Sequence, residues 1–135
     1  MVVEMIIEKK KEKEKNKSDL NLHEKQSGRG VVIGGANIDI KGKSYGELVG
    51  ITSNPGKVSM ALGRVGRNIA HNLALLGVPV TFLSVVGDDE WGRKILGETG
   101  DAGVDMEHVK ISRKNSTGIY LAILDENGEM HLSNF

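Results

Sequence analysis

One stretch of the sequence, "GRVGRNIAHNLALLGVPVTFLSVVG" at residues 63–87, most constrains the fold. Apolar residues recur at helical spacing between Ile69 and Leu76, and Gly77 is well placed to end a helix. The run that follows, residues 80–87, is typical of a buried strand. A helix that leads directly into a buried strand predicts an α/β domain built on a parallel sheet.

Further elements alternate on both sides of this unit. The β-branched run after Gly30 predicts a buried strand, residues 43–53 predict a weaker strand, and residues 88–103 predict a helix opened by acidic residues. Three more strands are expected at residues 108–112, 117–124 and 130–135, with Gly128 in the left-handed position of the last turn. This alternation predicts an α/β fold with right-handed crossovers. Only about two crossover units are present, so we expect the first part of a larger architecture.

Composition excludes several classes of protein. The chain has 135 residues, about enough for one domain, with 18 basic and 18 acidic residues. Because the net charge is zero, the composition does not indicate electrostatic attraction to nucleic acid or to an anionic membrane. The chain has no cysteine, which excludes disulfides and thiolate metal sites and fits a reducing compartment. No apolar run approaches the roughly 18–20 residues that span a bilayer. We therefore expect a cytoplasmic protein without nucleic-acid or membrane partners.

The chain divides into two segments of different composition. Residues 1–29 are dominated by Lys and Glu, and such a polar segment cannot bury enough apolar surface to offset its ordering entropy. We expect a flexible tail there, with a solvated helix as the alternative. The packed α/β part is expected at residues 30–135.

The glycines at residues 63–68 invite comparison with phosphate-binding loops. A P-loop needs Lys followed by Ser or Thr after its glycines, and "GRVGRN" has neither. A dinucleotide fingerprint needs G-x-G-x-x-G directly after the first strand, and "VVIGGANID" lacks that spacing. Both phosphate-loop interpretations therefore fail.

Two other groups of residues are candidate ligand contacts. Asn37 and Asp39 share one face if their segment is extended, and an amide beside a carboxylate can bind the vicinal hydroxyls of a sugar. The alternative is that both residues only shape a turn. Gly63, Gly66 and Asn68 precede the predicted helix, where free backbone N–H groups face outward. The alternative for Asn68 is a helix N-cap.

No metal site is expected in this chain. Asp88 and Asp89 stand side by side in "GDDEWG" and resemble a metal-binding pair. At the start of a helix, however, adjacent acidic residues more often cap the helix and complement its dipole. We therefore assign them to capping.

Together these motifs resemble the first signature of the pfkB-type carbohydrate kinases, which have the ribokinase-like fold. The stretches "VVIGGANIDIKG", "VVGDDEWGRKIL", "AGVDMEHV" and "STGIYLAILDENGEM" are also similar to that family, and "GRVGRNIA" and the last stretch look most like pseudouridine kinases. The signature positions that fall in register are Gly63, Gly66, Asn68, Ala70, Gly77 and Gly87. The resemblance implies the N-terminal part of a Rossmann-like central sheet with a small β-sheet lid, truncated relative to the family.

The resemblance also implies a sugar site. It places Asn37 and Asp39 at hydroxyl-binding positions and the loop from Gly63 through Gly66 to Asn68 at backbone and amide contacts to the sugar. It places lid strands around Lys43–Thr52 and Thr117–Leu124, where Thr117 and Tyr120 could contact a nucleobase-like group. Packing within the core or lid is the alternative for Tyr120. A homodimer through the lid strands is a further expectation.

The implied function is the N-terminal substrate-binding portion of an ATP-dependent sugar or nucleoside kinase that phosphorylates a ribosyl hydroxyl. The family's second signature, a glycine-rich anion hole with the catalytic aspartate, is not matched in this sequence. We therefore expect no catalytic residue in this chain. ATP and Mg²⁺ are expected for the full-length family, with no site for them here. The alternative is a non-catalytic truncated remnant or a sugar-binding module.

Arg64 is the one departure inside the first signature, because the family pattern has Gly at this position. If the position requires a positive φ or touches the ligand closely, Arg costs backbone strain or fills the site. If the guanidinium projects outward, the replacement is neutral.

Overall fold

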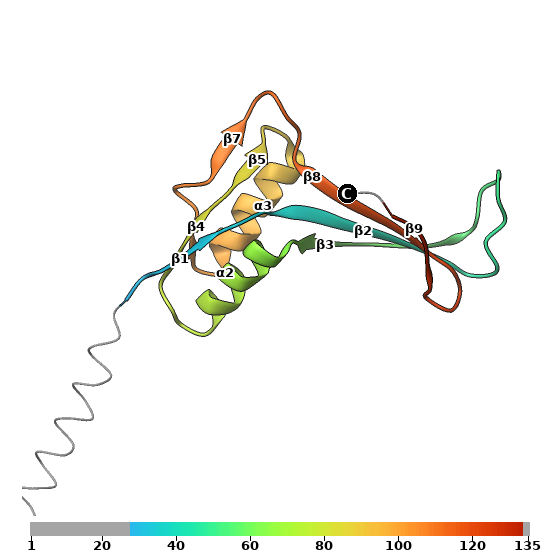
Figure 1. Ribbon diagram of the computed structural model, residues 1–135, viewed down its shortest axis with the longest axis horizontal. Helices are drawn as coiled ribbons and strands as arrows, with labels where there is room; N and C mark the ends of the chain where they lie inside the picture. The colour runs from blue at the N-terminus through green and yellow to red at the C-terminus, as the bar shows by residue number, and fades with distance from the viewer. Residues whose placement is uncertain (1–27, 134–135) are drawn as a thin grey trace, which may run out of the picture.

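The computed structural model describes residues 28–133, which form an α/β body from which a β-sheet lid extends to one side (Figure 1). The body contains the parallel strands β1 (Gly30–Ile33), β4 (Val80–Leu83) and β6 (Val104–Asp105), in the order β1-β4-β6. Strands β5 (Val85–Gly87) and β7 (Lys110–Ser112) form a second parallel pair. The parallel α/β body predicted from the sequence is therefore confirmed. The Lys/Glu-rich tail prediction falls mostly on residues 1–27, outside the described part.

Helix α2 (Val65–Leu75) packs on β1 and β4 and ends where the sequence predicts. Gly77 has a φ of 78°, its N–H donates to the Ala74 carbonyl, and the Val78 N–H donates to the Leu73 carbonyl. These two bonds form a Schellman motif, which satisfies carbonyls at the end of the helix. The end of α2 is thus fixed by local sequence.

The buried face of α2 differs from the predicted apolar stripe. Ala70 is fully buried and Leu73 is half-buried, whereas Ile69 and Leu76 are exposed. The small Ala70 side chain lets the helix lie close to the sheet, so the residues that touch the core are not the largest apolar ones.

A glycine–glycine contact explains this close approach. Gly34 follows β1 and Gly66 lies in the first turn of α2; a Cβ added to Gly66 would lie 2.8 Å from the Gly34 Cα, and one added to Gly34 would lie 2.9 Å from the Gly66 Cα. Both distances are shorter than real Cβ contacts allow. The main chains of β1 and α2 can therefore cross only because both residues are glycine.

Helix α3 (Glu90–Asp101) contacts β2, β5 and β6 and closes the core. Its N-cap is Asp89, whose side chain accepts a hydrogen bond from the Gly92 N–H, so the predicted capping role is confirmed for Asp89, whereas the Asp88 carboxylate pairs with Arg93 and Arg113. The core between the helices and strands is built from Ile38, Ala70, Val80, Phe82, Val86, Ile95, Val104 and Val109. No helix among residues 28–133 is long and apolar enough to cross a membrane.

The lid is a four-stranded sheet in the order β3-β2-β8-β9. Its strands are β2 (Asn37–Ser44), β3 (Gly56–Gly63), β8 (Gly118–Leu124) and β9 (Met130–Ser133). Strand β2 pairs antiparallel with β3 and parallel with β8, and β8 pairs antiparallel with β9. Gly128 has a φ of 90° in the β8–β9 turn, so the predicted hairpin is confirmed.

The first lid strand was placed too late in the sequence. The prediction of a strand at residues 43–53 is wrong beyond Ser44, because β2 ends there and a loop with Gly46 and Gly50 follows. Strand β3 was not predicted, although Val58, Met60 and Leu62 alternate with small or polar residues as a strand requires. The turn-rich residues before it concealed this period of two.

Alternation gives the lid two different faces. Asn37, Asp39, Lys41 and Lys43 of β2 share one face, while Ile38 and Ile40 lie on the other. The strand register places further apolar residues on the second face, namely Val58, Met60, Leu62, Ile119, Leu121, Ile123 and Leu132. This apolar lid face packs on the core near Ile38 and becomes exposed farther along the lid.

The glycine crossing predicts opposite effects for two Gly→Ala substitutions in helices. Gly66→Ala should lower the free energy of unfolding by about 1–3 kcal/mol, because its Cβ overlaps the Gly34 backbone. Gly97→Ala, in α3, meets no atom within 4 Å and should stabilise by about 0.5–1 kcal/mol through helix propensity. Urea denaturation followed by circular dichroism measures both. Equal stabilisation by the two changes would contradict the close crossing.

Candidate functional site

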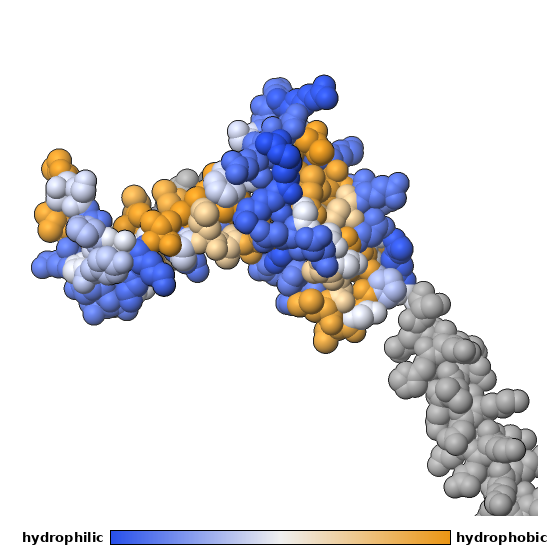
Figure 2. All heavy atoms as spheres, turned by 180° about the vertical axis from the view of Figure 1, so that it is seen from behind, coloured by the Kyte–Doolittle hydropathy of each residue, from blue (hydrophilic) through white to orange (hydrophobic). Residues whose placement is uncertain are grey.

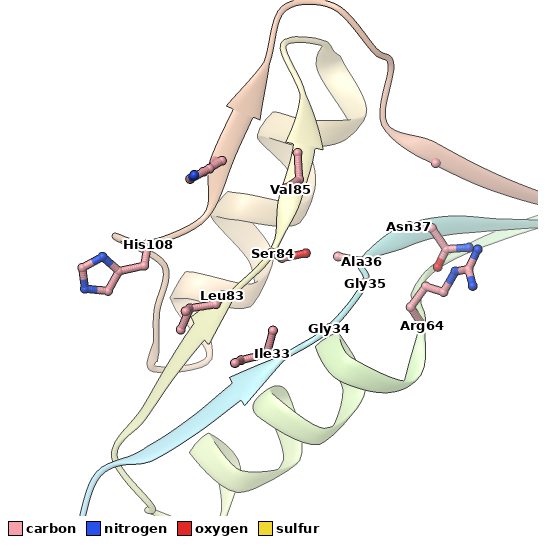
Figure 3. Close-up of a pocket in the computed structure, with 12 residues that line it drawn as sticks. Ile33, Gly34, Gly35, Ala36, Asn37, Arg64, Leu83, Ser84, Val85 and His108 are labelled. Atoms are coloured by element: carbon pink, nitrogen blue, oxygen red, sulfur yellow. The ribbon is translucent and has the colours of Figure 1, made fainter.

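A cavity of about 600 Å³ opens where β1 passes into β2 (Figure 3). It lies at the carboxyl ends of β1 and β4, the edge of a parallel sheet where ligands usually bind. Residues from the body and from the start of the lid both contribute to its wall. The lining residues are Ile33, Gly34, Gly35, Ala36, Asn37, Arg64, Leu83, Ser84, Val85, His108, Lys110 and Gly118.

Asn37 is the first residue of β2, which lies between β3 and β8 in the lid. The register places it opposite Gly63 of β3 and beside Gly118 of β8, so glycine flanks it on both sides. Its side chain is buried, its Nδ2 donates to Asp39 Oδ1 at 3.1 Å, and its Oδ1 is buried without a hydrogen-bond partner among the described residues. A buried acceptor without a partner is costly and rare, which indicates that a ligand donor can bind there.

Asp39 is held beside Asn37 but does not line the cavity. A Cβ on Gly63 would overlap the Asp39 carboxylate, so the glycine provides the space that this side chain occupies. The expected pairing of an amide and a carboxylate on one face of an extended strand is therefore present. The alternative that these residues only shape a turn is wrong, because both lie within β2.

Asn68, by contrast, is exposed in the first turn of α2 and does not line the cavity. It is not the N-cap either, because that position is Arg64. Its side-chain Oδ1 accepts a hydrogen bond from Arg67 at 3.4 Å. Of the candidate sugar contacts in β2 and at residues 63–68, only Asn37 lines the cavity. Asp39 and Gly63 lie beside it in the lid, Gly66 contacts Gly34 of the wall, and Asn68 lies apart.

Arg64 has the strained backbone that the sequence suggested. Its φ is 76° and its ψ is 143°, close to a region that only glycine occupies readily. Its Cγ and Cδ lie 3.7 Å from the position of a Cβ on Gly35, so the side chain covers the Gly35 backbone at the cavity wall. Figure 3 shows the guanidinium on the same flank of the cavity as Asn37. The stem of the side chain thus lies on the cavity wall, while the residue is exposed, and whether the replacement of Gly is neutral remains a prediction.

Arg67 is a buried residue that the sequence interpretation missed. Its Nε donates to the Thr99 hydroxyl at 3.1 Å, which ties α2 to α3 behind the cavity. Burial lowers the pKa of Arg67 below its ordinary value, and the nearby Glu98 carboxylate opposes this shift. An Arg beside a glycine loop gives no sequence signal of such burial.

Thr117 lies in a hydrogen-bond network rather than in the cavity wall. Its hydroxyl donates to Asp89 Oδ1 at 2.7 Å and accepts from the Gly87 N–H at 2.9 Å, while its own N–H donates to Asp89 Oδ2 at 2.7 Å. Hydrogen bonds from the Thr117 and Gly92 N–H groups and from the Thr117 hydroxyl lower the pKa of Asp89. This network fixes the start of β8 against α3. A substrate contact by Thr117 remains a prediction.

Tyr120 is half-buried in β8, beside Asp39 in the register. Its hydroxyl contacts the sulfur of Met130 in β9 at 3.5 Å. This contact supports packing within the lid, and a nucleobase contact by Tyr120 remains a prediction.

Three cavity residues gave no signal in the sequence. Ser84 separates β4 from β5, which the sequence predicted as a single strand, and its Oγ is buried without a described partner. His108 and Lys110 reach the cavity from the segment that follows α3. Among residues 28–133 no group of three or more His, Asp or Glu side chains is arranged to hold a metal ion.

The parallel body, the lid on the carboxyl ends of its strands and the cavity between them define the ribokinase-like class of α/β proteins. The sequence profile described as "pfkB family carbohydrate kinase" matches residues 29–135, and the chain belongs to this family.

Relatives of known name support this membership. The chain is 47% identical over 100 residues to a pseudouridine kinase from Escherichia coli, covering 74% of this chain and 32% of that protein. It is 37% identical over 102 residues to a guanosine-inosine kinase from Exiguobacterium acetylicum, covering 76% of this chain and 34% of that protein. The chain thus spans about a third of the length of these relatives.

Solved structures show the same fold. A carbohydrate kinase from Agrobacterium tumefaciens superposes with a TM-score of 0.72 at 31% identity, over 78% of this chain and 34% of that one. An Arabidopsis thaliana ribokinase, complexed with ribose and ATP, superposes with a TM-score of 0.68 at 27% identity, over 75% of this chain and 33% of that one. The predicted family and fold class are confirmed.

The Asp89 network predicts a pH-dependent stability. A lowered pKa means that folding favours the ionised carboxylate, so the advantage of the wild type over Asp89→Asn should be present above about pH 4, the ordinary Asp value. It should disappear as the pH falls through the lowered pKa. Urea denaturation between pH 7 and pH 3 measures this difference.

The matched control is Asp88→Asn. Asp88 is exposed, and its ion pairs with Arg93 and Arg113 are long, at 3.7 and 3.9 Å. Removing its charge should change the free energy of unfolding by less than about 0.5 kcal/mol at any pH. If the stability of Asp88→Asn and Asp89→Asn depends on pH in the same way, the Asp89 network is not the source of the pH-dependent stability.

Proposed function

We propose that this chain forms the N-terminal, substrate-binding portion of an ATP-dependent sugar or nucleoside kinase that phosphorylates a ribosyl hydroxyl, with pseudouridine as the candidate substrate. The observation that carries this proposal is the buried, unpartnered Oδ1 of Asn37 in the cavity wall, beside the Asp39 carboxylate. Family membership and the pseudouridine kinase relative supply the reaction class.

The chemistry of the pair suits vicinal hydroxyls. Asn37 Oδ1 can accept a hydrogen bond from one sugar hydroxyl in the cavity, and the Asp39 carboxylate, which lies beside Asn37 and outside the cavity wall, can accept from a neighbouring hydroxyl. The bare backbone of Gly34 and Gly35 lets a sugar ring approach closely. The cavity thus offers acceptors where a ribosyl group presents donors, which is the basis of orientation in small-molecule sites.

ATP and Mg²⁺ are part of the proposal for the whole kinase. None of the cavity-lining residues is Asp or Glu, the side chains that hold Mg²⁺ best. The described residues therefore do not fit the metal, and we assign its site outside them. We also propose the cytoplasm as the compartment, because the chain has no cysteine.

A binding module without catalysis is the alternative function. It shares the sugar site and differs only in turnover, so the binding experiment below tests the site that both functions need. Sustained ATP-dependent phosphorylation of pseudouridine by the 135-residue chain would exclude the module.

If the cavity is the sugar site, substitutions in its wall should lower the affinity for pseudouridine without unfolding the protein. Gly118→Ala places a methyl group 3.6 Å from the Asn37 Cβ, an ordinary contact, yet fills space in the cavity. Because it narrows the cavity, this change should weaken pseudouridine binding by at least about tenfold. Asn37→Ala should weaken binding by a similar factor, because it removes the side chain that would form a hydrogen bond with the ligand. Isothermal titration calorimetry on the 135-residue chain measures the affinity, and thermal melting checks the fold.

Gly97→Ala in α3 is the control, because it adds the same methyl group away from the cavity. It should leave pseudouridine affinity unchanged. The proposed site would be contradicted if pseudouridine did not bind the wild type, or if Gly118→Ala, Asn37→Ala and Gly97→Ala bound it with equal affinity.

The proposed partner of the lid is a second copy of this chain. The apolar lid face includes the exposed side chains of Val58, Met60 and Leu132, and Figure 2 shows hydrophobic atoms along the lid arm. An exposed apolar stripe on a flat sheet favours burial against a like surface.

The dimer predicts different effects for adjacent positions of β3. Met60→Lys places a charge on the apolar lid face, whereas Ser59→Lys places it on the opposite, polar face. Both side chains are exposed, so neither change should prevent folding. Sedimentation velocity should show Met60→Lys as a monomer and Ser59→Lys as a dimer. A monomeric wild type would contradict the proposal.

A further inference from the structure

The cavity wall carries an unbalanced positive charge. Arg64, which precedes α2, and His108 and Lys110, from the segment that follows α3, line it, and no carboxylate is among the lining residues. Within residues 28–133 the side chains of Arg64 and Lys110 form no hydrogen bond or ion pair. Asp39, beside Asn37 and outside the wall, is one carboxylate against two permanent cations, so the net positive charge favours an anionic ligand.

Arg64 is placed there at a conformational cost. Its φ of 76° with a ψ of 143° is a conformation that glycine adopts readily and other residues rarely do. Arg64 is exposed, but its Cγ and Cδ lie 3.7 Å from the position of a Cβ on Gly35, so the stem of the side chain lies on the cavity wall. Strained residues of this kind cluster at ligand sites, where the surrounding structure retains them.

A second observation shows that the cavity is built for a ligand. Asn37 is 4% exposed, lines the cavity, and its Oδ1 has no partner among the described residues. The Oγ of Ser84, also in the cavity wall, is buried and equally without a partner. A complementary ligand therefore carries hydroxyl donors for these oxygens and negative charge for Arg64 and Lys110.

We propose that Arg64, assisted by Lys110, is a specificity-determining residue that selects a ribosyl substrate bearing an anionic group over its neutral counterpart. This inference rests on the proposed function, because it assumes that the ribosyl hydroxyls bind at Asn37. It narrows the substrate class: a phosphate or carboxylate attached to the sugar receives the planar guanidinium, which matches the geometry of both groups. Pseudouridine, which is neutral, then becomes the weaker ligand of the site.

The experiment compares ligands that share the sugar and differ in charge. Ribose, ribose 1-phosphate, ribose 5-phosphate and ribonate are titrated into the 135-residue chain by calorimetry. At least one anionic ligand should bind the wild type ten or more times tighter than ribose. The two phosphate isomers and the carboxylate identify which anionic group, at which position, is preferred.

Variants of Arg64 then test its role. Arg64→Gly relieves the positive φ and should raise the melting temperature while reducing the anionic-to-neutral affinity ratio at least tenfold. Arg64→Lys keeps the charge and should retain part of the ratio, and Lys110→Gln should reduce it by a smaller factor. The ratio in the wild type should also fall as salt is raised.

Two results would overturn the inference. A wild-type ratio near one would show that the cations do not select charge, and an unchanged ratio in Arg64→Gly would show that Arg64 does not. If Arg64→Gly strengthens ribose and the anionic sugars equally, the side chain only obstructs the loop. These results leave ribosyl binding intact, whereas failure of every ribosyl compound to bind the wild type removes the proposed function as well.

Discussion

The contact between Gly34 and Gly66 determines how the body and the cavity are arranged. Because neither residue has a Cβ, the end of β1 and the first turn of α2 lie in direct backbone contact. This contact brings Arg64, the N-cap of α2, onto the backbone of Gly35. It also places α2 close enough for Ala70 to seal against the sheet. A larger side chain at either glycine would separate these elements and open the cavity wall.

The lid depends on a related use of glycine. Gly63 leaves room for the Asp39 carboxylate, and Gly118 leaves space beside Asn37, so the central strand can carry two polar side chains in a crowded sheet. At the far side of the cavity, Asp89 holds Thr117 at the start of β8. The Asn37–Asp39 pair and the network that fixes the start of β8 are therefore formed by different residues, and a substrate contact by Thr117 remains a prediction.

Much of the fold could be predicted because its signals are local. The Schellman motif at Gly77, the cap at Asp89 and the turn at Gly128 each depend on a few neighbouring residues. Strand β3 had an equally local signal in Val58, Met60 and Leu62, but it was not predicted from the sequence, where a turn-rich stretch directly precedes it. The pairing of Asn37 with Asp39 followed from the period of a strand.

By itself, therefore, the sequence determined the α/β class, the family and the helix ends, because each rests on residue types at fixed spacing, whereas the positive φ of Arg64 was known only from the structure. Only the tertiary structure decided which residues share the cavity. His108 and Lys110 line the same cavity as Arg64 although they lie far from it in the sequence, Arg67 is buried against Thr99, and Asn68 remains exposed outside the cavity. These outcomes depend on how closely α2, α3 and the strands pack, and no local spacing encodes such non-local distances.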